Sequence, residues 1–147
     1  MKPRLKYLAF VTVASLYLFA LLRFTMMGSD EGVLLVEAER IVNGQVYARD
    51  FLPGVGPGSL YILAAWFKIF GVSFAVARIY LSLTLLATGG LVFFLSRRLC
   101  GSLWLTPCAL LMGTYLGLES SGVSHHFDSN LYVLLAVVCV VVWQKNR

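Results

Sequence analysis

Apolar residues gather in four long stretches, separated by segments that hold most of the polar and charged residues. A helix needs about 20 apolar residues to cross the hydrocarbon core of a bilayer, because each residue rises about 1.5 Å. The stretches at residues 7–27 and 72–95 meet this length. The stretch at 103–122 reaches this length only if its polar C-terminal end is counted, and the stretch at 130–143 is shorter than this length. We predict an all-α membrane protein with four transmembrane helices in one domain.

The composition agrees with a membrane protein. Hydrophobic residues make up 59% of the 147 residues and charged residues 13%, with a mean hydropathy of +0.82. A soluble domain is typically about 45–50% apolar and about 25% charged, so a soluble globular domain is excluded. Disorder requires low hydrophobicity. The 12 Lys and Arg residues are scattered along the chain, whereas a nucleic-acid-binding protein clusters them on one face.

The charges predict the orientation of the four helices. Three segments carry Lys and Arg but no acid: the N-terminus, the connection after residue 95, and the C-terminus. The seven acids all fall on the other side of the membrane, at Asp30, Glu31, Glu37, Glu39, Asp50, Glu119 and Asp128. By the positive-inside rule both termini are cytoplasmic, and residues 28–71 and 119–129 are external.

The first apolar stretch could also be a cleaved signal peptide. A cleavage site needs small residues in a small-x-small pattern, but the stretch ends in Arg23-Phe-Thr-Met-Met-Gly-Ser. We therefore predict an uncleaved helix. Cys100 falls on the inner side, and Cys108 and Cys139 fall inside predicted helices, so the outer loops have no disulfide to form.

The first outer loop, residues 28–71, is predicted to hold two helices. The first begins after a cap at Ser29 or Asp30 and is stopped by Asn43-Gly44. Residues 52–58 are rich in Gly and Pro and are predicted not to be helical.

The second helix of this loop, Ser59–Phe70, is too short to cross a bilayer. It carries Tyr61, Trp66 and Lys68, which are residues that suit the membrane interface. We predict that both helices lie on the outer membrane face.

Two groups of polar residues could carry chemistry. Asp30 and Glu31 follow the first span, where acids either act in catalysis or favour the dipole of a helix N-terminus by about 0.3–1 kcal/mol. His125, His126 and Asp128 precede the fourth span. They could bind a metal or a phosphate, or form a solvated helix entry with Asp128 or Ser129 as the N-cap.

The order of these features resembles the N-terminal part of the GT-C superfamily of polytopic membrane glycosyltransferases, in particular its aminoarabinose-transferase-like and protein-mannosyltransferase-like branches. The resemblance runs from the first span to the end of the chain and rests on five weak motifs in the right order. These are the acidic pair Asp30-Glu31, the segment Glu37–Tyr47 with its G-x-x-Y exit, Gly56-Pro57-Gly-Ser-Leu-Tyr61, Trp66-Phe-Lys-Ile-Phe-Gly71 followed by Arg78, and Phe127-Asp128.

The resemblance implies a transferase in the inner membrane of a bacterium. The donor is a sugar on a polyprenyl phosphate, and the acceptor is a lipid, glycan or protein. Asp30 is then the general base, and Glu31 and Asp128 are the other candidate catalytic acids. The cations available for the lipid phosphate are Arg78, Arg49 and Lys68, of which the resemblance favours Arg78.

Further candidates complete the expected site. Tyr61, His125 and His126 are candidate substrate-binding residues. No cofactor is certain, and a divalent metal held by Asp30, Asp128 or His125 is left open. Because lone interfacial cations often only extend toward the headgroups, Arg49 and Lys68 could equally be such cations.

Two departures from the family pattern matter. Gly56 stands where the family has a basic residue, and the sequence has four predicted spans where family members have many more. The expected partners besides the bilayer and the donor are therefore a missing C-terminal half or a second membrane subunit. The alternative function is a non-catalytic scaffold or a lipid-carrier-binding subunit.

Overall fold

The computed structural model describes residues 12–13, 16, 29–99, 123 and 125–145. Four helices account for most of this part: α2 (Ser29–Val42), α3 (Pro57–Phe70), α4 (Phe74–Leu99) and α6 (His125–Lys145). The described ranges contain no strand, and their one isolated bridge joins Tyr47 to Phe51. The all-helical prediction is confirmed for this part of the chain. The predicted spans at 7–27 and 103–122 lie almost wholly outside the described residues.

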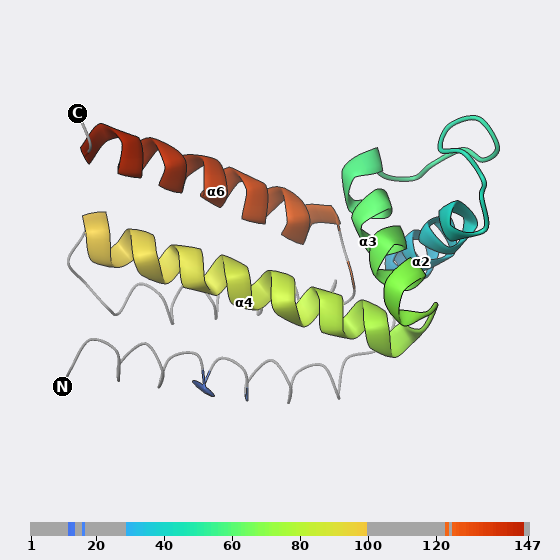
Figure 1. Cartoon of the computed structure of the whole chain (residues 1–147), viewed down its shortest axis with the longest axis horizontal. Helices are drawn as coiled ribbons and strands as arrows, with labels where there is room; N and C mark the ends of the chain where they lie inside the picture. Colours follow the sequence, from blue (N-terminus) through green and yellow to red (C-terminus); the bar gives the residue numbers. More distant parts are fainter. Residues whose placement is uncertain (1–11, 14–15, 17–28, 100–122, 124, 146–147) are drawn as a thin grey trace.

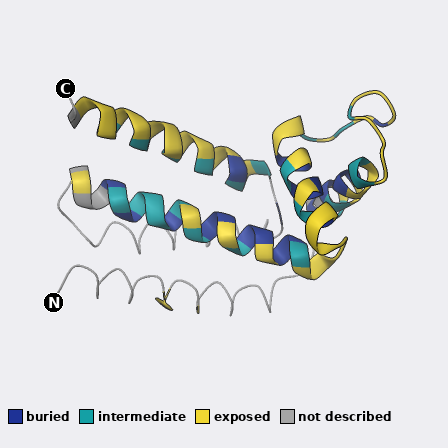
Figure 2. Cartoon of the chain, viewed as in Figure 1, coloured by how far each residue is buried: buried dark blue, intermediate teal, exposed yellow. Residues whose placement is uncertain are grey.

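Within the described ranges, two helices are long and apolar enough to cross a membrane. They are Phe74–Leu95 within α4 and His125–Gln144 within α6. The two helices lie side by side and begin at the same end (Figure 1), which we call the site end. Most of the α6 surface is exposed, whereas α4 alternates between buried and exposed positions (Figure 2). Apolar side chains that face outward along both helices suit contact with lipid.

The starts of both long helices differ from the sequence prediction. α4 begins at Phe74 because Ser73 caps it: the Ser73 hydroxyl accepts a hydrogen bond from the Val76 N–H over 3.2 Å. α6 begins at His125, five residues before the predicted start at Asn130.

The prediction that Asp128 or Ser129 is the N-cap of α6 is wrong, because both lie inside this helix. The Ser129 hydroxyl instead donates to the His125 carbonyl over 3.0 Å. Polar residues are tolerated in a first turn, where backbone N–H groups lack helical partners and the dipole favours an acid.

The two helices of the first loop are present, with one corrected boundary. α2 ends at Val42, and Gly44, with φ 88°, follows it in the left-handed region that Asn-Gly predicts. α3 begins at Pro57, so the prediction that residues 52–58 contain no helix is wrong for the last two. Proline fits the first position of a helix because its missing N–H has no partner to lose there.

The buried core joins α2, α3 and the first turns of α4. Its largest contributions come from α3, where Leu60, Leu63 and Phe67 are almost fully buried. In Figure 1, α3 crosses α4 steeply at the site end, and α2 packs against α3. The α2–α3 pair therefore sits on one end of the α4–α6 pair. This corner positions the candidate site.

Candidate functional site

Glu31 joins three separate parts of the chain. It lies in the first turn of α2 and is only 2% exposed. One carboxylate oxygen accepts a hydrogen bond from Nη2 of Arg78 over 2.8 Å, and the other accepts from the Val123 N–H over 2.9 Å. Both oxygens of Glu31 are thus engaged, one by α4 and the other by Val123, two residues before the start of α6.

Arg78 forms a buried ion pair with Glu31. The two side chains are 9% and 1% exposed. The guanidinium carbon of Arg78 also lies 4.6 Å from the centroid of the Phe74 ring, one turn earlier on α4, in a cation–π arrangement. Burial of an ion pair is costly unless geometry and further hydrogen bonds compensate. Here the ring and the Val123 N–H supply such contacts.

Asp128 is the second buried acid at the site end. It is 4% exposed and accepts a hydrogen bond from the Tyr80 hydroxyl through Oδ1. Its Oδ2 makes no hydrogen bond to the part of the chain that the structure describes. Tyr80 is itself buried, and its ring centroid lies 6.0 Å from that of Trp66 on α3. Asp128 therefore keeps one oxygen for a ligand.

Glu31 and Asp128 converge on α4 because their partners, Arg78 and Tyr80, are two residues apart. The side chain of Asp30 lies outside the description, although its backbone belongs to the first turn of α2. The prediction that Asp30 and Asp128 share a cavity thus stays a prediction, while the neighbouring Glu31 lies at the same corner as Asp128.

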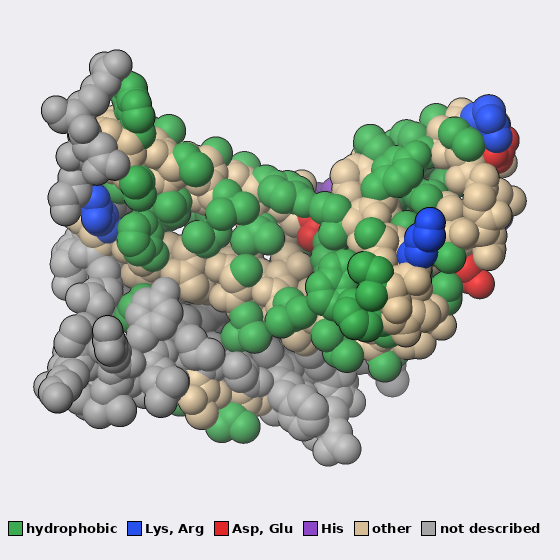
Figure 3. Space-filling model, viewed as in Figure 1, with side chains coloured by type: hydrophobic (Ala, Val, Ile, Leu, Met, Phe, Trp, Pro, Cys, Tyr) green, Lys and Arg blue, Asp and Glu red, His purple; other side chains and the backbone are tan. Residues whose placement is uncertain are grey.

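The two histidines stand at the start of α6. Their ring centroids are 4.0 Å apart. Figure 3 shows the surface hollowed between α6 and α3, with acidic and histidine side chains visible there. Within the described ranges, no three His, Cys, Asp or Glu side chains are grouped so that they could hold a metal ion. The divalent metal left open at Asp30, Asp128 or His125 remains untested, because the side chain of Asp30 lies outside the described residues.

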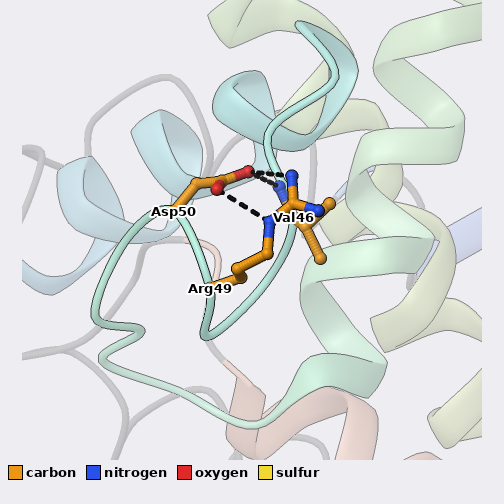
Figure 4. A network of polar contacts seen from close by, with 3 residues as sticks. All are labelled: Val46, Arg49 and Asp50. Carbon is orange, nitrogen blue, oxygen red and sulfur yellow. Dashed lines mark hydrogen bonds and ion pairs between the residues drawn. The ribbon is translucent and has the colours of Figure 1, made fainter.

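The other predicted substrate-binding residues lie elsewhere. Arg49 is on the loop between α2 and α3, where its Nε and Nη2 donate to the two oxygens of Asp50, each over 2.9 Å (Figure 4). These bonds and the bond from the Val46 N–H hold the pKa of Asp50 down at about 2, and the contact raises the pKa of Arg49. Lys68 is exposed in the last turn of α3, and Tyr61 is half exposed beside Tyr47.

Sequence reasoning missed the roles of Tyr80 and Glu37. Tyr80 lies in an apolar helix, and nothing in the sequence besides its own hydroxyl group indicates a polar role for it. Glu37 is 6% exposed, and its Oε1 accepts a hydrogen bond from the Gly54 N–H over 2.8 Å. Its Oε2 is buried without a hydrogen-bond partner within the described structure. An acid in the middle of a helix is usually exposed, so only packing could identify this one.

Comparison with known proteins returned no relative: no family model matches the chain, and neither a curated protein nor a solved structure does. The site is therefore interpreted from its own geometry and from the motif order.

Proposed function

We propose that this chain forms part of a membrane glycosyltransferase that takes a sugar from a polyprenyl phosphate at the outer membrane face. The observation that supports it is the gathering of two buried acids and one cation, Glu31, Asp128 and Arg78, at the site end. Two helices that could cross a membrane meet there. A lipid-linked donor keeps its phosphate at headgroup depth, so its site must lie at the end of spanning helices.

The proposed reaction is an inverting displacement. Asp30 takes the proton of the acceptor hydroxyl, whose oxygen attacks the anomeric carbon. The bond from that carbon to the phosphate oxygen breaks, and the lipid phosphate leaves with the electron pair. Glu31 is poorly suited to be the base, since both its oxygens are engaged. It orients Arg78, which contacts the phosphate, and Asp128 positions the acceptor through its unengaged oxygen.

The charges of the acids and of the cation at this corner bear on whether the proposed site needs a metal ion. Two described acids face one cation at this corner, which leaves an excess of negative formal charge beside the proposed donor phosphate. A divalent cation or a protonated His125 or His126 would offset the excess and help to hold the donor phosphate. A transfer assay with and without a chelator distinguishes the two.

The test is sugar transfer from a labelled polyprenyl-phosphate donor by the protein in liposomes, together with the membrane subunit or the downstream segment if either is required. Asp30→Asn is expected to abolish transfer and leave donor binding intact, because it removes a proton acceptor and no phosphate ligand. Glu39→Gln, which alters an exposed acid on the same helix, is the matched control and should remain active. Near-normal transfer by Asp30→Asn would refute its role as the base.

A second candidate function is a non-catalytic membrane scaffold or lipid-carrier-binding subunit. The observation in its favour is that Glu31 and Asp128 both bridge helices through Arg78, Val123 and Tyr80. A scaffold predicts that Asp128→Asn lowers stability while transfer is absent in the wild type as well. The transferase predicts donor turnover by the wild type under the conditions above.

The proposal includes the orientation of the chain in a bacterial inner membrane, with both termini in the cytoplasm. Among the described residues, Arg98 lies at the far end of α4 from the site end, where the buried acids lie. Reporter fusions at Gly44 and Gly101 should therefore read as external and cytoplasmic, respectively. A fusion at Gly101 that reads as external would overturn the orientation.

A further inference from the structure

Four exposed apolar side chains surround the turn from α3 into α4. They are Ile69 and Phe70 at the end of α3, Val72 in the link, and Phe74 at the start of α4, which we call the apolar elbow. Their exposed fractions lie between 44% and 73%. Gly71, with φ 89°, makes the sharp turn between them. A soluble protein rarely leaves such a large apolar patch open to water.

The apolar elbow continues into the exposed side of α4. Ile79 and Leu83 are 54% and 47% exposed and lie four residues apart, on one face of α4. This face belongs to a helix that is long and apolar enough to cross a membrane. Figure 3 shows hydrophobic side chains gathered where α3 meets α4. The surface is therefore continuous from the elbow to the spanning helix.

Packing among the described residues leaves much of the elbow exposed, although the Phe70 ring contacts Trp66 and the Phe74 ring contacts Arg78. The opposite face of α3, with Leu60, Leu63 and Phe67, forms the core against its neighbours. Beside the elbow, Lys68 is exposed in the last turn of α3. A lysine next to an apolar surface suits a bilayer, since its stem lies against hydrocarbon and its ammonium group reaches the lipid phosphates.

We propose that the apolar elbow inserts into the hydrocarbon of the membrane leaflet at the site end. The ammonium group of Lys68 then lies at the level of the lipid phosphates of that leaflet. The partner is a lipid surface, and the proposal depends on α4 crossing the membrane but not on any transferase activity. Insertion sets the depth of the first turn of α4. Because Arg78 lies one turn after Phe74 and stacks on it, the elbow holds the Arg78–Glu31 pair close below the headgroups.

Spin labels test the depth of the elbow in the full chain reconstituted in nanodiscs. In a background with all three cysteines replaced by alanine, Ile69→Cys and Phe70→Cys carry the label in turn. Both labels should collide more often with oxygen, which concentrates in hydrocarbon, than with a water-soluble nickel chelate. Leu52→Cys is the water-facing control, because Leu52 is 95% exposed on the loop between α2 and α3. Val133→Cys on α6 is the lipid-facing control.

Each outcome decides the proposal. Greater collision with the nickel chelate at Ile69 and Phe70, as at Leu52, would overturn it. Protection of both positions from both reagents would also overturn it, because a protein surface, such as a second copy of the chain, would then cover the elbow.

If the cysteine-free background does not fold, Phe70→p-benzoylphenylalanine in the native chain serves instead. Irradiation should add the mass of one lipid, which Leu52→p-benzoylphenylalanine should not show. A crosslinked protein dimer, or no lipid adduct at position 70, would refute insertion.

Discussion

Removing Arg78 should destabilise the protein strongly, because it leaves the buried charge of Glu31 without its cation. The Glu31 side chain is 1% exposed and would retain only the bond from the Val123 N–H. Breaking a buried ion pair by removing one partner typically costs about 3–5 kcal/mol. We expect Arg78→Met to lower the free energy of unfolding by about 3–5 kcal/mol, since methionine fills much of the same volume without the charge.

Removing the charge of Glu31 instead of that of Arg78 should cost less stability. Glu31→Gln keeps an oxygen for the Val123 N–H, and the Arg78 cation keeps its contact with the Phe74 ring. A lost hydrogen bond to a charged group costs about 1.5–3 kcal/mol, which is the loss we expect. In the double variant no charge remains buried, so the two losses should not add. The coupling energy between the two positions should be about 1.5–3 kcal/mol.

The assay is reversible unfolding in mixed micelles of increasing SDS fraction, followed by circular dichroism for the wild type, both single variants and the double variant. The slope of the transition must stay constant for the free energies to be comparable. The exposed pair Arg49–Asp50 is the matched control, and its variants should show no resolvable coupling. If the losses at Glu31 and Arg78 add within about 0.5 kcal/mol, the ion pair does not hold α2 to α4.

Three further predictions follow from single contacts. Tyr80→Phe removes the only hydrogen bond that Asp128 receives within the described residues. It should lower the free energy of unfolding by about 1.5–3 kcal/mol in the same assay. The control Tyr132→Phe, at a half-exposed tyrosine, should be nearly neutral. Gly71→Ala should cost about 1–3 kcal/mol because φ 89° with ψ 152° is a glycine conformation, while Gly58→Ala inside α3 should stabilise by up to about 1 kcal/mol. Asp50 has a folded pKa of about 2, below its usual 3.8, so its contribution to stability is complete above pH 3.8 and is lost as the pH falls through 2. The protection factor of the Val46 N–H against hydrogen exchange should fall over that interval, and Asp50→Asn should remove this pH dependence of the protection factor.

The all-helical fold of the described residues and the positions of several helices could be predicted from the sequence because these depend on local properties. A long apolar run needs lipid or a core whatever surrounds it, and α4 and α6 are such runs. The end of α2 at Val42 follows from Asn43-Gly44, since glycine alone adopts the left-handed region without strain. The start of α6 was misplaced because the polar residues His125–Ser129 are compatible with either a loop or a first turn.

The pairing of the acids was decided only by the tertiary structure. Neighbouring positions on a helix point about 100° apart, so the sequence could not say which residue of Asp30-Glu31 meets α4. Packing of α2 and α3 across the site end brings Glu31 to Arg78, 47 residues away, and Asp128 lies 48 residues from Tyr80. Such contacts depend on the rotation of each helix about its axis and on the angles at which helices cross. Many buried side chains together determine these angles, so no local sequence pattern predicts them.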